Sequence, residues 1–302
     1  MARSASAFVA LPSLRAVLEL LKPVTWFPPM WAFGCGILSS GAPLSDAPGL
    51  VLAGLLLAGP LLCASSQVVN DWFDREVDAL NEPGRPIPSG RIPGRWGLYL
   101  AIGWSVLSAA WAATLGPLVF ASALVGLALA WAYSAPPLRL KRNGWWGNAA
   151  AAISYEGIAW MTGAVLLTGT IADPRIVLLA LCYSAGAHGI MTLNDFKSLD
   201  GDRRLGIRSL PVQLGPERAA RIACIVMIVP QAAVVAALFA WGASVHGLVV
   251  AALLLAQVLL MSRFLAQPRA RALWYSAVGI NFYVLGMLAS ALALRALPVG
   301  AS

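Results

Sequence analysis

The sequence predicts an all-α integral membrane protein, a nine-transmembrane-helix bundle with its N-terminus in the cytoplasm. Two features of composition lead to this class. Of the 302 residues 59% are apolar and only 11% are charged, whereas about 25% of the residues of a soluble domain are charged. The chain also has a mean hydropathy of +0.76, enough to fill it with helices of the roughly 20 apolar residues that cross a bilayer. No room remains for a separate soluble domain.

Apolar runs bounded by charged residues, Gly or Pro place the spans in order along the chain. The first contains Pro28, Pro29 and Gly34, which membrane helices tolerate because neighbouring groups satisfy the freed backbone. The second and sixth lead into acidic segments, and Gly116 separates the third from the fourth. The nine predicted spans are 24–40, 50–70, 97–115, 117–135, 149–168, 175–195, 219–241, 245–264 and 273–294.

The basic residues predict the orientation, because short cytoplasmic segments are enriched in Lys and Arg. With the N-terminus inside, only Arg175 and Arg295 of the 21 Lys and Arg residues fall on the outer side. Losing one span would destroy this alternation. The net charge of +8 is scattered between apolar runs, so it reports membrane orientation and argues against binding of nucleic acid.

An oxygen-rich stripe follows the second span. Asn70, Asp74 and Asp78 are spaced by four residues, and four residues rotate a helix by about 400°, so the three side chains share one face. Two carboxylates and an amide oxygen suit Mg²⁺, which proteins hold with one or two carboxylates plus substrate phosphates and water. Taken singly, these residues would also fit a solvated helix end.

A second stripe repeats the pattern after the sixth span, at an offset of 124 residues. Asn194, Ser198 and Asp202 match the first stripe, and Asp195 lies seven residues before Asp202. Ion pairing with neighbouring basic residues is the alternative, but it does not explain the matched spacing. We therefore expect a metal site between two weakly related halves of a single domain, about 24–135 and 149–264, followed by a ninth helix, 273–294.

Basic residues flank both stripes on the same predicted membrane face. Arg85 stands in a Pro-rich loop, and Arg139 and Lys141 follow the fourth span. Arg binds phosphate in a bidentate manner and Lys binds it as a point charge, so these three residues are candidates for a diphosphate site. Lys197 and Arg203, which lie beside the second stripe in the sequence, are further candidates. The positive-inside distribution alone would also account for such residues.

The motifs resemble those of the UbiA superfamily of intramembrane prenyltransferases over nearly the whole chain. The resemblance rests on the Asn70-x3-Asp74-x3-Asp78 pattern and on four stretches that are similar to those of chlorophyll and bacteriochlorophyll synthases. Within this branch, the stretch Gly90 to Gly97 resembles bacteriochlorophyll synthases more than chlorophyll synthases. The stretches are Asn70 to Ala79 with Arg85 to Arg91, Tyr133 to Lys141, Asn194 to Arg203, and Gly90 to Gly97.

The resemblance implies esterification of the propionate of bacteriochlorophyllide a with geranylgeranyl or phytyl diphosphate, releasing diphosphate. It implies that the cofactor is Mg²⁺ and that the protein lies in the lipid bilayer of a cytoplasmic or photosynthetic intracytoplasmic membrane. Contacts with pigment-pathway or light-harvesting proteins are left open. Asp74, Asp78 and Asp202 would act in catalysis by holding metal, with Asn70, Asn194 and Asp195 as further ligands. Ser198 stands where many superfamily members have Asp, which puts the number of metal ions in doubt.

Two alternatives remain at this stage. Another prenyltransferase of the superfamily would have a chlorophyll, quinone-precursor or haem acceptor. A secondary transporter also has repeated halves, but its ionisable residues usually lie near the bilayer midplane, whereas here they crowd one predicted face. Glu156, inside the fifth span, is either functional or a buried hydrogen-bonded residue, and His188 is expected to pack in the core.

Overall fold

The computed structural model describes residues 11–171 and 173–298. Arg3, which the orientation argument counts as cytoplasmic, lies outside these residues. Helices dominate the described chain, and the only strand-like pairing is an isolated bridge between Asn143 and Arg208. The helices are α1 Leu14–Leu21, η1 Pro23–Thr25, α2 Phe27–Ser39, η2 Leu44–Asp46, α3 Pro48–Leu56, η3 Leu57–Cys63, α4 Ala64–Asn81, α5 Trp96–Leu115, α6 Pro117–Ser134, η4 Leu140–Arg142, α7 Gly144–Ala152, η5 Ile153–Ile158, α8 Ala159–Leu166, α9 Pro174–Arg204, α10 Leu210–Leu214, α11 Pro216–Ala240, α12 Ser244–Ala266 and α13 Pro268–Ala296.

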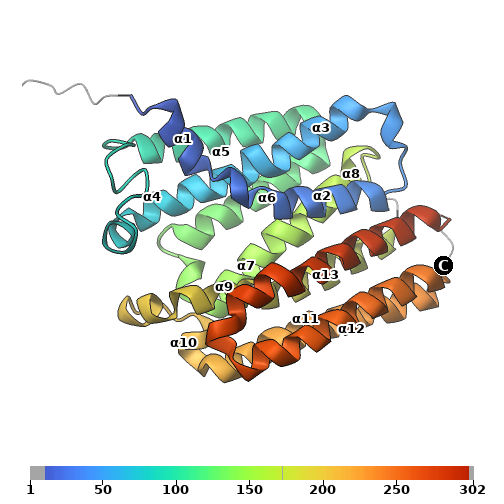
Figure 1. Cartoon of the computed structure of the whole chain (residues 1–302). Coiled ribbons are helices and arrows are strands. Elements are labelled where there is room, and N and C mark those ends of the chain that lie inside the picture. Colours follow the sequence, from blue (N-terminus) through green and yellow to red (C-terminus); the bar gives the residue numbers. More distant parts are fainter. Residues whose placement is uncertain (1–10, 172, 299–302) are drawn as a thin grey trace, which may run out of the picture.

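The long helices lie side by side in one bundle (Figure 1). Eight helical runs of the described chain are long and apolar enough to cross a membrane, which confirms the predicted all-α membrane fold. The first predicted span corresponds to α2, whose 13 residues extend about 20 Å, less than the ~30 Å hydrocarbon core. The count of nine spans and the cytoplasmic N-terminus therefore stay predictions.

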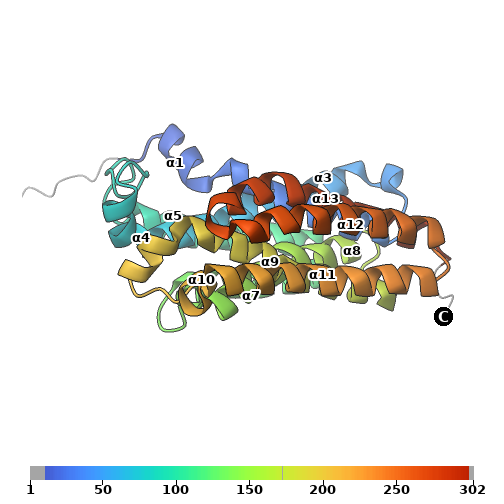
Figure 2. The same cartoon turned by 60° about the horizontal axis from the view of Figure 1, so that its bottom comes forward.

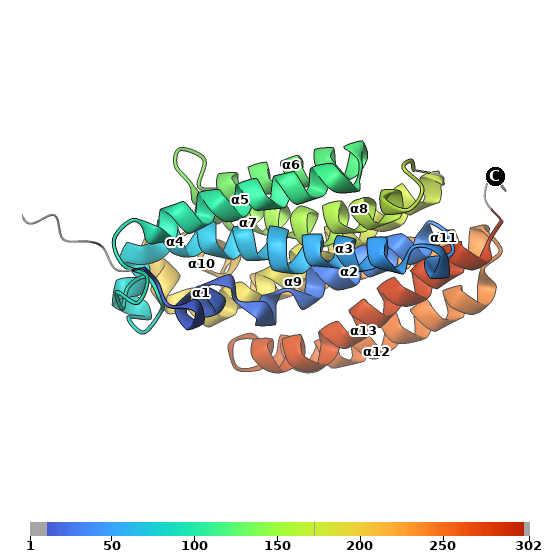
Figure 3. The same ribbon diagram turned by 90° about the horizontal axis from the view of Figure 1, so that it is seen from above.

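The bundle has α5 and α6 along one edge and α12 and α13 along the opposite edge (Figure 3). Turning the molecule shows α11 and α12 as a flanking pair, with α9 in the interior beside them (Figure 2). This arrangement leaves α2, α4, α7, α8 and α9 between the two edges, and α4 and α9 carry the two predicted stripes. The polar ends of α4 and α9 lie at the same end of the bundle.

Close packing of α2 against α8 builds the centre of the bundle. A Cβ atom added to Gly36 would meet the Trp160 carbonyl, and one added to Gly163 would meet the Phe33 carbonyl. Small residues allow membrane helices to approach this closely. Trp160 is fully buried and donates its indole N–H to Ser39 Oγ at 3.1 Å, so its polar group is satisfied in the interior.

Two π-helical turns interrupt the middle helices. Pro60 lies inside η3, the turn between α3 and α4, where its missing N–H and its ring prevent regular α-helical hydrogen bonding. The second π turn, η5, joins α7 to α8 and carries Tyr155 and Glu156. Wide turns of this kind occur often at functional sites in helices, and both border the cavity described below.

The end of the bundle opposite the stripes carries the two basic residues that were assigned to the outer side. Arg295 donates to the Ala42 carbonyl at 3.0 Å, and Arg175 forms an ion pair with Asp173 at 2.6 Å. Both lie at the end of the bundle where α2 terminates and α9 begins, away from the polar ends of α4 and α9. These two basic residues and the acidic stripes therefore lie at opposite ends of the bundle.

Candidate active site

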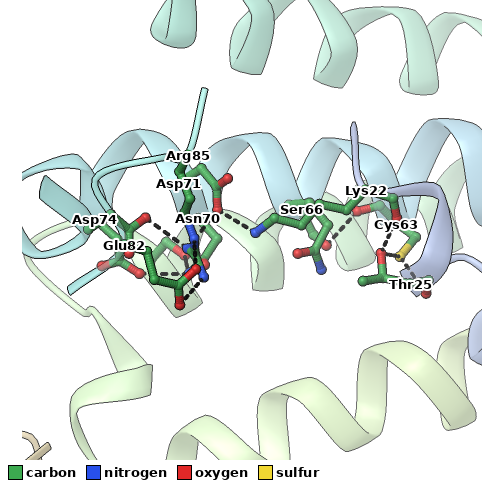
Figure 4. Close-up of polar contacts among 12 residues, drawn as sticks. Lys22, Thr25, Cys63, Ser66, Asn70, Asp71, Asp74, Glu82 and Arg85 are labelled. Atoms are coloured by element: carbon green, nitrogen blue, oxygen red, sulfur yellow. Dashed lines mark hydrogen bonds and ion pairs between the residues drawn. The ribbon is translucent and has the colours of Figure 1, made fainter. Parts of the chain in front are cut away.

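The first stripe lies on α4, and the Pro-rich loop folds back over it. Arg85 Nη1 reaches Asp78 Oδ2 at 2.8 Å and Asp71 Oδ1 at 3.5 Å, while its Nε reaches Glu82 Oε2 at 2.6 Å. Lys22, just after α1, donates to Asp71 Oδ1 at 2.6 Å. Figure 4 shows these side chains meeting along one side of α4. Arg85 is therefore held beside the first stripe, and its role in binding diphosphate stays a prediction.

The second basic cluster reaches the middle of the same stripe. Lys141 Nζ lies 2.6 Å from Asp74 Oδ1, and Arg139 lies 3.7 Å from the same oxygen. Asn70 donates to the other oxygen, Asp74 Oδ2, at 3.1 Å. Burial lowers the pKa of the Lys141 ammonium, and the Asp74 carboxylate opposes this shift. Each carboxylate of the stripe thus has a cation beside it.

The second stripe lies on α9. Asn148 of α7 donates to Asp195 Oδ2 at 3.0 Å, and Ser198 donates to Asp202 Oδ2 at 2.9 Å. Asn194 is exposed and turns toward the cavity between α4 and α9. The hydroxyl at position 198 therefore supports Asp202 instead of adding a charge.

Lys197 and Arg203 are not brought into this network. Both are exposed, and neither forms an ion pair within residues 11–171 and 173–298. At 100° per residue, each lies roughly 100° or more around α9 from the middle of the stripe. Their predicted role in binding diphosphate stays a prediction.

One residue of each stripe lines a cavity of about 430 Å³. Asn70 of α4 and Asn194 of α9 both line it, so the first residues of the matched patterns face the same space. From there the cavity extends into the bundle between α2, α4, α6 and η5. The arrangement joins the polar ends of α4 and α9 to a mainly apolar interior, which suits a substrate with an anionic head and an apolar chain.

The sequence reasoning missed Asp71 and Lys22. Asp71 is only 1% exposed, and it lies 7 residues before Asp78, so both carboxylates point to nearly the same side of α4. The signal was available, because Asp71 matches Asp195 at the offset of 124 residues and Asp195 was included in the predicted site. Lys22 carried no signal, since 49 residues separate it from its partner.

Oxygen donors suitable for a hard divalent cation are present on both helices. Among the described residues, no three His, Cys, Asp or Glu side chains already converge on one point. Mg²⁺ sites of this kind take one or two protein carboxylates and complete the shell with phosphate and water. The six predicted ligands, Asn70, Asp74, Asp78, Asn194, Asp195 and Asp202, therefore fit a metal that binds together with its substrate.

The two residues whose roles the sequence left open lie away from the stripes. Glu156 is 7% exposed, and its Oε2 has no hydrogen-bond partner in the part of the chain that the structure describes. His188 is half-buried and not in the core, and its Nε2 lies 3.2 Å from the Trp145 carbonyl oxygen. Neither side chain lines the cavity.

Comparison with known proteins identifies the family. Residues 26–294 match the model of the UbiA prenyltransferase family. The chain belongs to the UbiA prenyltransferase family. This membership confirms the resemblance seen in the sequence and establishes the protein as a multi-pass membrane prenyltransferase.

Several similar members of the family are named for pigment synthesis. The chain is 52% identical to the bacteriochlorophyll synthase 33 kDa chain of Cereibacter sphaeroides, over 96% of each chain. It is 51% identical to the protein of the same name from Rhodobacter capsulatus, again over 96% of each. The chlorophyll synthase of Oryza sativa is 41% identical over 91% of this chain and 76% of its own length.

Solved structures of the family share the fold. A UbiA homologue from Archaeoglobus fulgidus, bound to DMAPP and Mg²⁺, superposes with a TM-score of 0.67 and 20% identity, and the match covers 90% of this chain and 99% of the homologue. A structure of digeranylgeranylglyceryl phosphate synthase gives a TM-score of 0.71 with 20% identity and covers 92% of this chain and 98% of the other. At this identity the likeness establishes the fold alone.

Proposed function

We propose that this UbiA family member esterifies the propionate of bacteriochlorophyllide a with geranylgeranyl or phytyl diphosphate. The observation that carries the proposal is the 52% identity over 96% of the chain to a bacteriochlorophyll synthase. The cavity adds support, because it joins two acidic stripes and their cations to an apolar interior. A prenyl diphosphate needs both environments.

The cofactor of the proposed reaction is Mg²⁺. The predicted ligands are all hard oxygen donors of the type that Mg²⁺ prefers, and a UbiA homologue has been solved with Mg²⁺ and a prenyl diphosphate. When bound, the metal would neutralise the diphosphate and make it a better leaving group. Asp74, Asp78 and Asp202 would act in catalysis by holding it.

The cations above the stripe would bind the diphosphate itself. Arg85, Arg139 and Lys141 already stand at the cytoplasmic end of the cavity in this proposal, each beside a stripe carboxylate. When substrate enters, these side chains can shift from carboxylate to phosphate oxygens, because charge-assisted hydrogen bonds to the two anions are alike. Lys197 and Arg203 would contact the diphosphate only after a change in side-chain direction.

The bond changes in the proposed reaction balance without a base. The allylic C–O bond breaks, and its electron pair leaves with the diphosphate. An oxygen of the propionate carboxylate then forms the new C–O bond to the same carbon. The carboxylate is already ionised at neutral pH, so the chain needs no residue that removes a proton, and preorganised charge around the leaving group supplies the stabilisation.

The family fold and the pattern of the chain support two wider inferences. The matched stripes on α4 and α9 suggest a single domain of two related halves, about 24–135 and 149–264, with α13 added after them. A pigment substrate supports a location in the cytoplasmic or photosynthetic intracytoplasmic membrane. There, pigment-pathway or light-harvesting proteins could supply the acceptor and take the product.

A pairwise substrate assay tests the proposed function. Purified protein in lipid receives bacteriochlorophyllide a or chlorophyllide a with geranylgeranyl or phytyl diphosphate, and the pigment ester is separated and identified by mass. We expect esters of bacteriochlorophyllide a that require Mg²⁺. Prenylation of a phenolic quinone precursor, with no pigment ester in any combination, would contradict the proposal.

A further inference from the structure

The lining of the cavity differs sharply from its rim. Lys141, Arg139 and Arg85 each form an ion pair with a carboxylate of the first stripe, and Asn70, which bonds to one of these carboxylates, lines the cavity. We refer to this charged end of α4 as the rim. Among the described residues, the cavity lining itself contains no Asp, Glu, Lys, Arg or His. Any anionic group that enters beyond Asn70 and Asn194 therefore meets neutral hydrogen-bond donors only.

A cluster of such donors lies about one helical turn inside the rim. Gln67 precedes Asn70 by three residues, so it stands about 4.5 Å deeper along α4. Its amide donates to the Tyr155 hydroxyl at 2.9 Å, and Cys63 Sγ lies 3.5 Å from the same oxygen. All three side chains line the cavity. Figure 4 shows Cys63, the last residue of η3, and Ser66 of α4 farther from Arg85 than Asn70 is.

The bonding within the cluster leaves an N–H donor of Gln67 for a ligand, and the Tyr155 hydroxyl beside it can turn its proton from Cys63 or Ser66 toward that ligand. An amide nitrogen can only donate, so the Tyr155 oxygen accepts from Gln67 and its own proton points elsewhere. Gln67 has a second N–H on the same nitrogen. The π turn η5 carries Tyr155 to α4, which places donors from two separate helices at one level of the cavity. Contacts that served only to join helices would not need to face an open space.

The level of the cluster matches the point where the new bond must form. If the diphosphate is held at the rim, its allylic carbon lies just inside, next to Gln67 and Ser66. The attacking carboxylate must reach the same carbon. A cation there would hold the carboxylate as a tight ion pair, whereas neutral donors orient it and leave its charge available for attack.

We propose that Gln67 and Tyr155 form the binding site for the carboxylate of the acceptor, separate from the charged site that binds the diphosphate. This inference rests on the proposed function, since it requires an acceptor that attacks through a carboxylate. It assigns the two steps of recognition to different residues: cations at the rim bind the donor, and neutral donors on α4 and η5 bind the acceptor.

The test places a negative charge at the proposed site. Gln67→Glu keeps the shape of the side chain but replaces its N–H donors with oxygens that repel a carboxylate. Loss of a hydrogen bond to a charged group costs about 1.5–3 kcal/mol, so we expect the KM for bacteriochlorophyllide a to rise roughly ten- to a hundredfold. The KM for the prenyl diphosphate should not change. Tyr155→Phe should show a smaller rise with the same selectivity.

A matched control variant and a ligand that donates hydrogen bonds where the substrate accepts them make the result specific. Ser65→Ala removes a buried hydroxyl from the same helix, where Ser65 Oγ lies 2.9 Å from Ser105 Oγ outside the cavity lining, and both KM values should stay as in the wild type. The primary amide of bacteriochlorophyllide, which offers N–H donors, should inhibit Gln67→Glu more strongly than it inhibits the wild type. A defect in folding alone would not produce that reversal.

The outcomes separate the two proposals. Absence of pigment ester from the wild type would refute the proposed function and this inference with it. Normal wild-type esterification, combined with an unchanged acceptor KM in Gln67→Glu or with an equal rise in both KM values, would overturn the inference alone. If Gln67→Glu does not accumulate in the membrane, Gln67→Met tests the same contact without adding charge, and an unchanged acceptor KM there would also overturn it.

Discussion

Replacement of Lys141 with Met removes one charge from the rim and keeps the length of the side chain. The ammonium lies 2.6 Å from Asp74 Oδ1, and the side chain is only 13% exposed, so water replaces the lost contact poorly. A charge-assisted hydrogen bond contributes about 1.5–3 kcal/mol. If this group binds the diphosphate, kcat/KM for both prenyl donors should fall roughly ten- to a hundredfold. The KM for the acceptor should be unchanged.

The same variant should have an opposite effect on the metal. Without the ammonium, Asp74 loses its nearest cation and becomes a stronger ligand, so the Mg²⁺ concentration that gives half the maximal rate should fall. Steady-state assays at varied donor and varied Mg²⁺ measure the two effects separately. Arg269→Met is the control, because Arg269 is exposed at the start of α13 and belongs to neither stripe nor to the predicted diphosphate site, and we expect little change. Unchanged donor kcat/KM for Lys141→Met at saturating Mg²⁺ would refute the reasoning and leave the ion pair with Asp74 as its sole role.

Three further results are expected. Asp74→Asn should abolish turnover while the protein still accumulates in the membrane, and EDTA should abolish wild-type turnover; activity near the wild-type level in either case would contradict the metal site. Cysteines placed at the exposed positions Ser89 and Ser244 should react with an impermeant reagent from opposite sides of the membrane, and labelling from one side would contradict the alternation of spans. The pKa of Glu19 is lowered by its hydrogen bonds from Arg91, which lie at 2.7 Å for Nη2. The contact between Glu19 and Arg91, which anchors α1, should therefore be complete at neutral pH and weaken as the pH falls through that lowered pKa. Hydrogen exchange in α1 should then become faster. The variant Glu19→Gln should lack this pH dependence.

The order of the helices and the acidic stripes could be predicted from local sequence. A span is recognised by its length and apolar composition, which need no knowledge of the rest of the chain. Residues four apart share a helix face in any helix, so the spacing of Asn70, Asp74 and Asp78 was enough to make them a candidate site. The motif also led to the family. The first predicted span is not among the eight runs long enough to cross a membrane, because α2 has only 13 residues.

The contacts that give the site its chemistry were decided only by the tertiary structure. Lys22 meets Asp71 across 49 residues, and Asn148 meets Asp195 across 47. Gln67 meets Tyr155 across 88, because a π turn sets the direction of the phenol. Helical periodicity determines which side of a helix a residue occupies, but it does not determine which helix lies opposite. That choice follows from the packing of the whole bundle, where small residues such as Gly36 and Gly163 allow two helices to meet and most buried polar groups find hydrogen-bond partners.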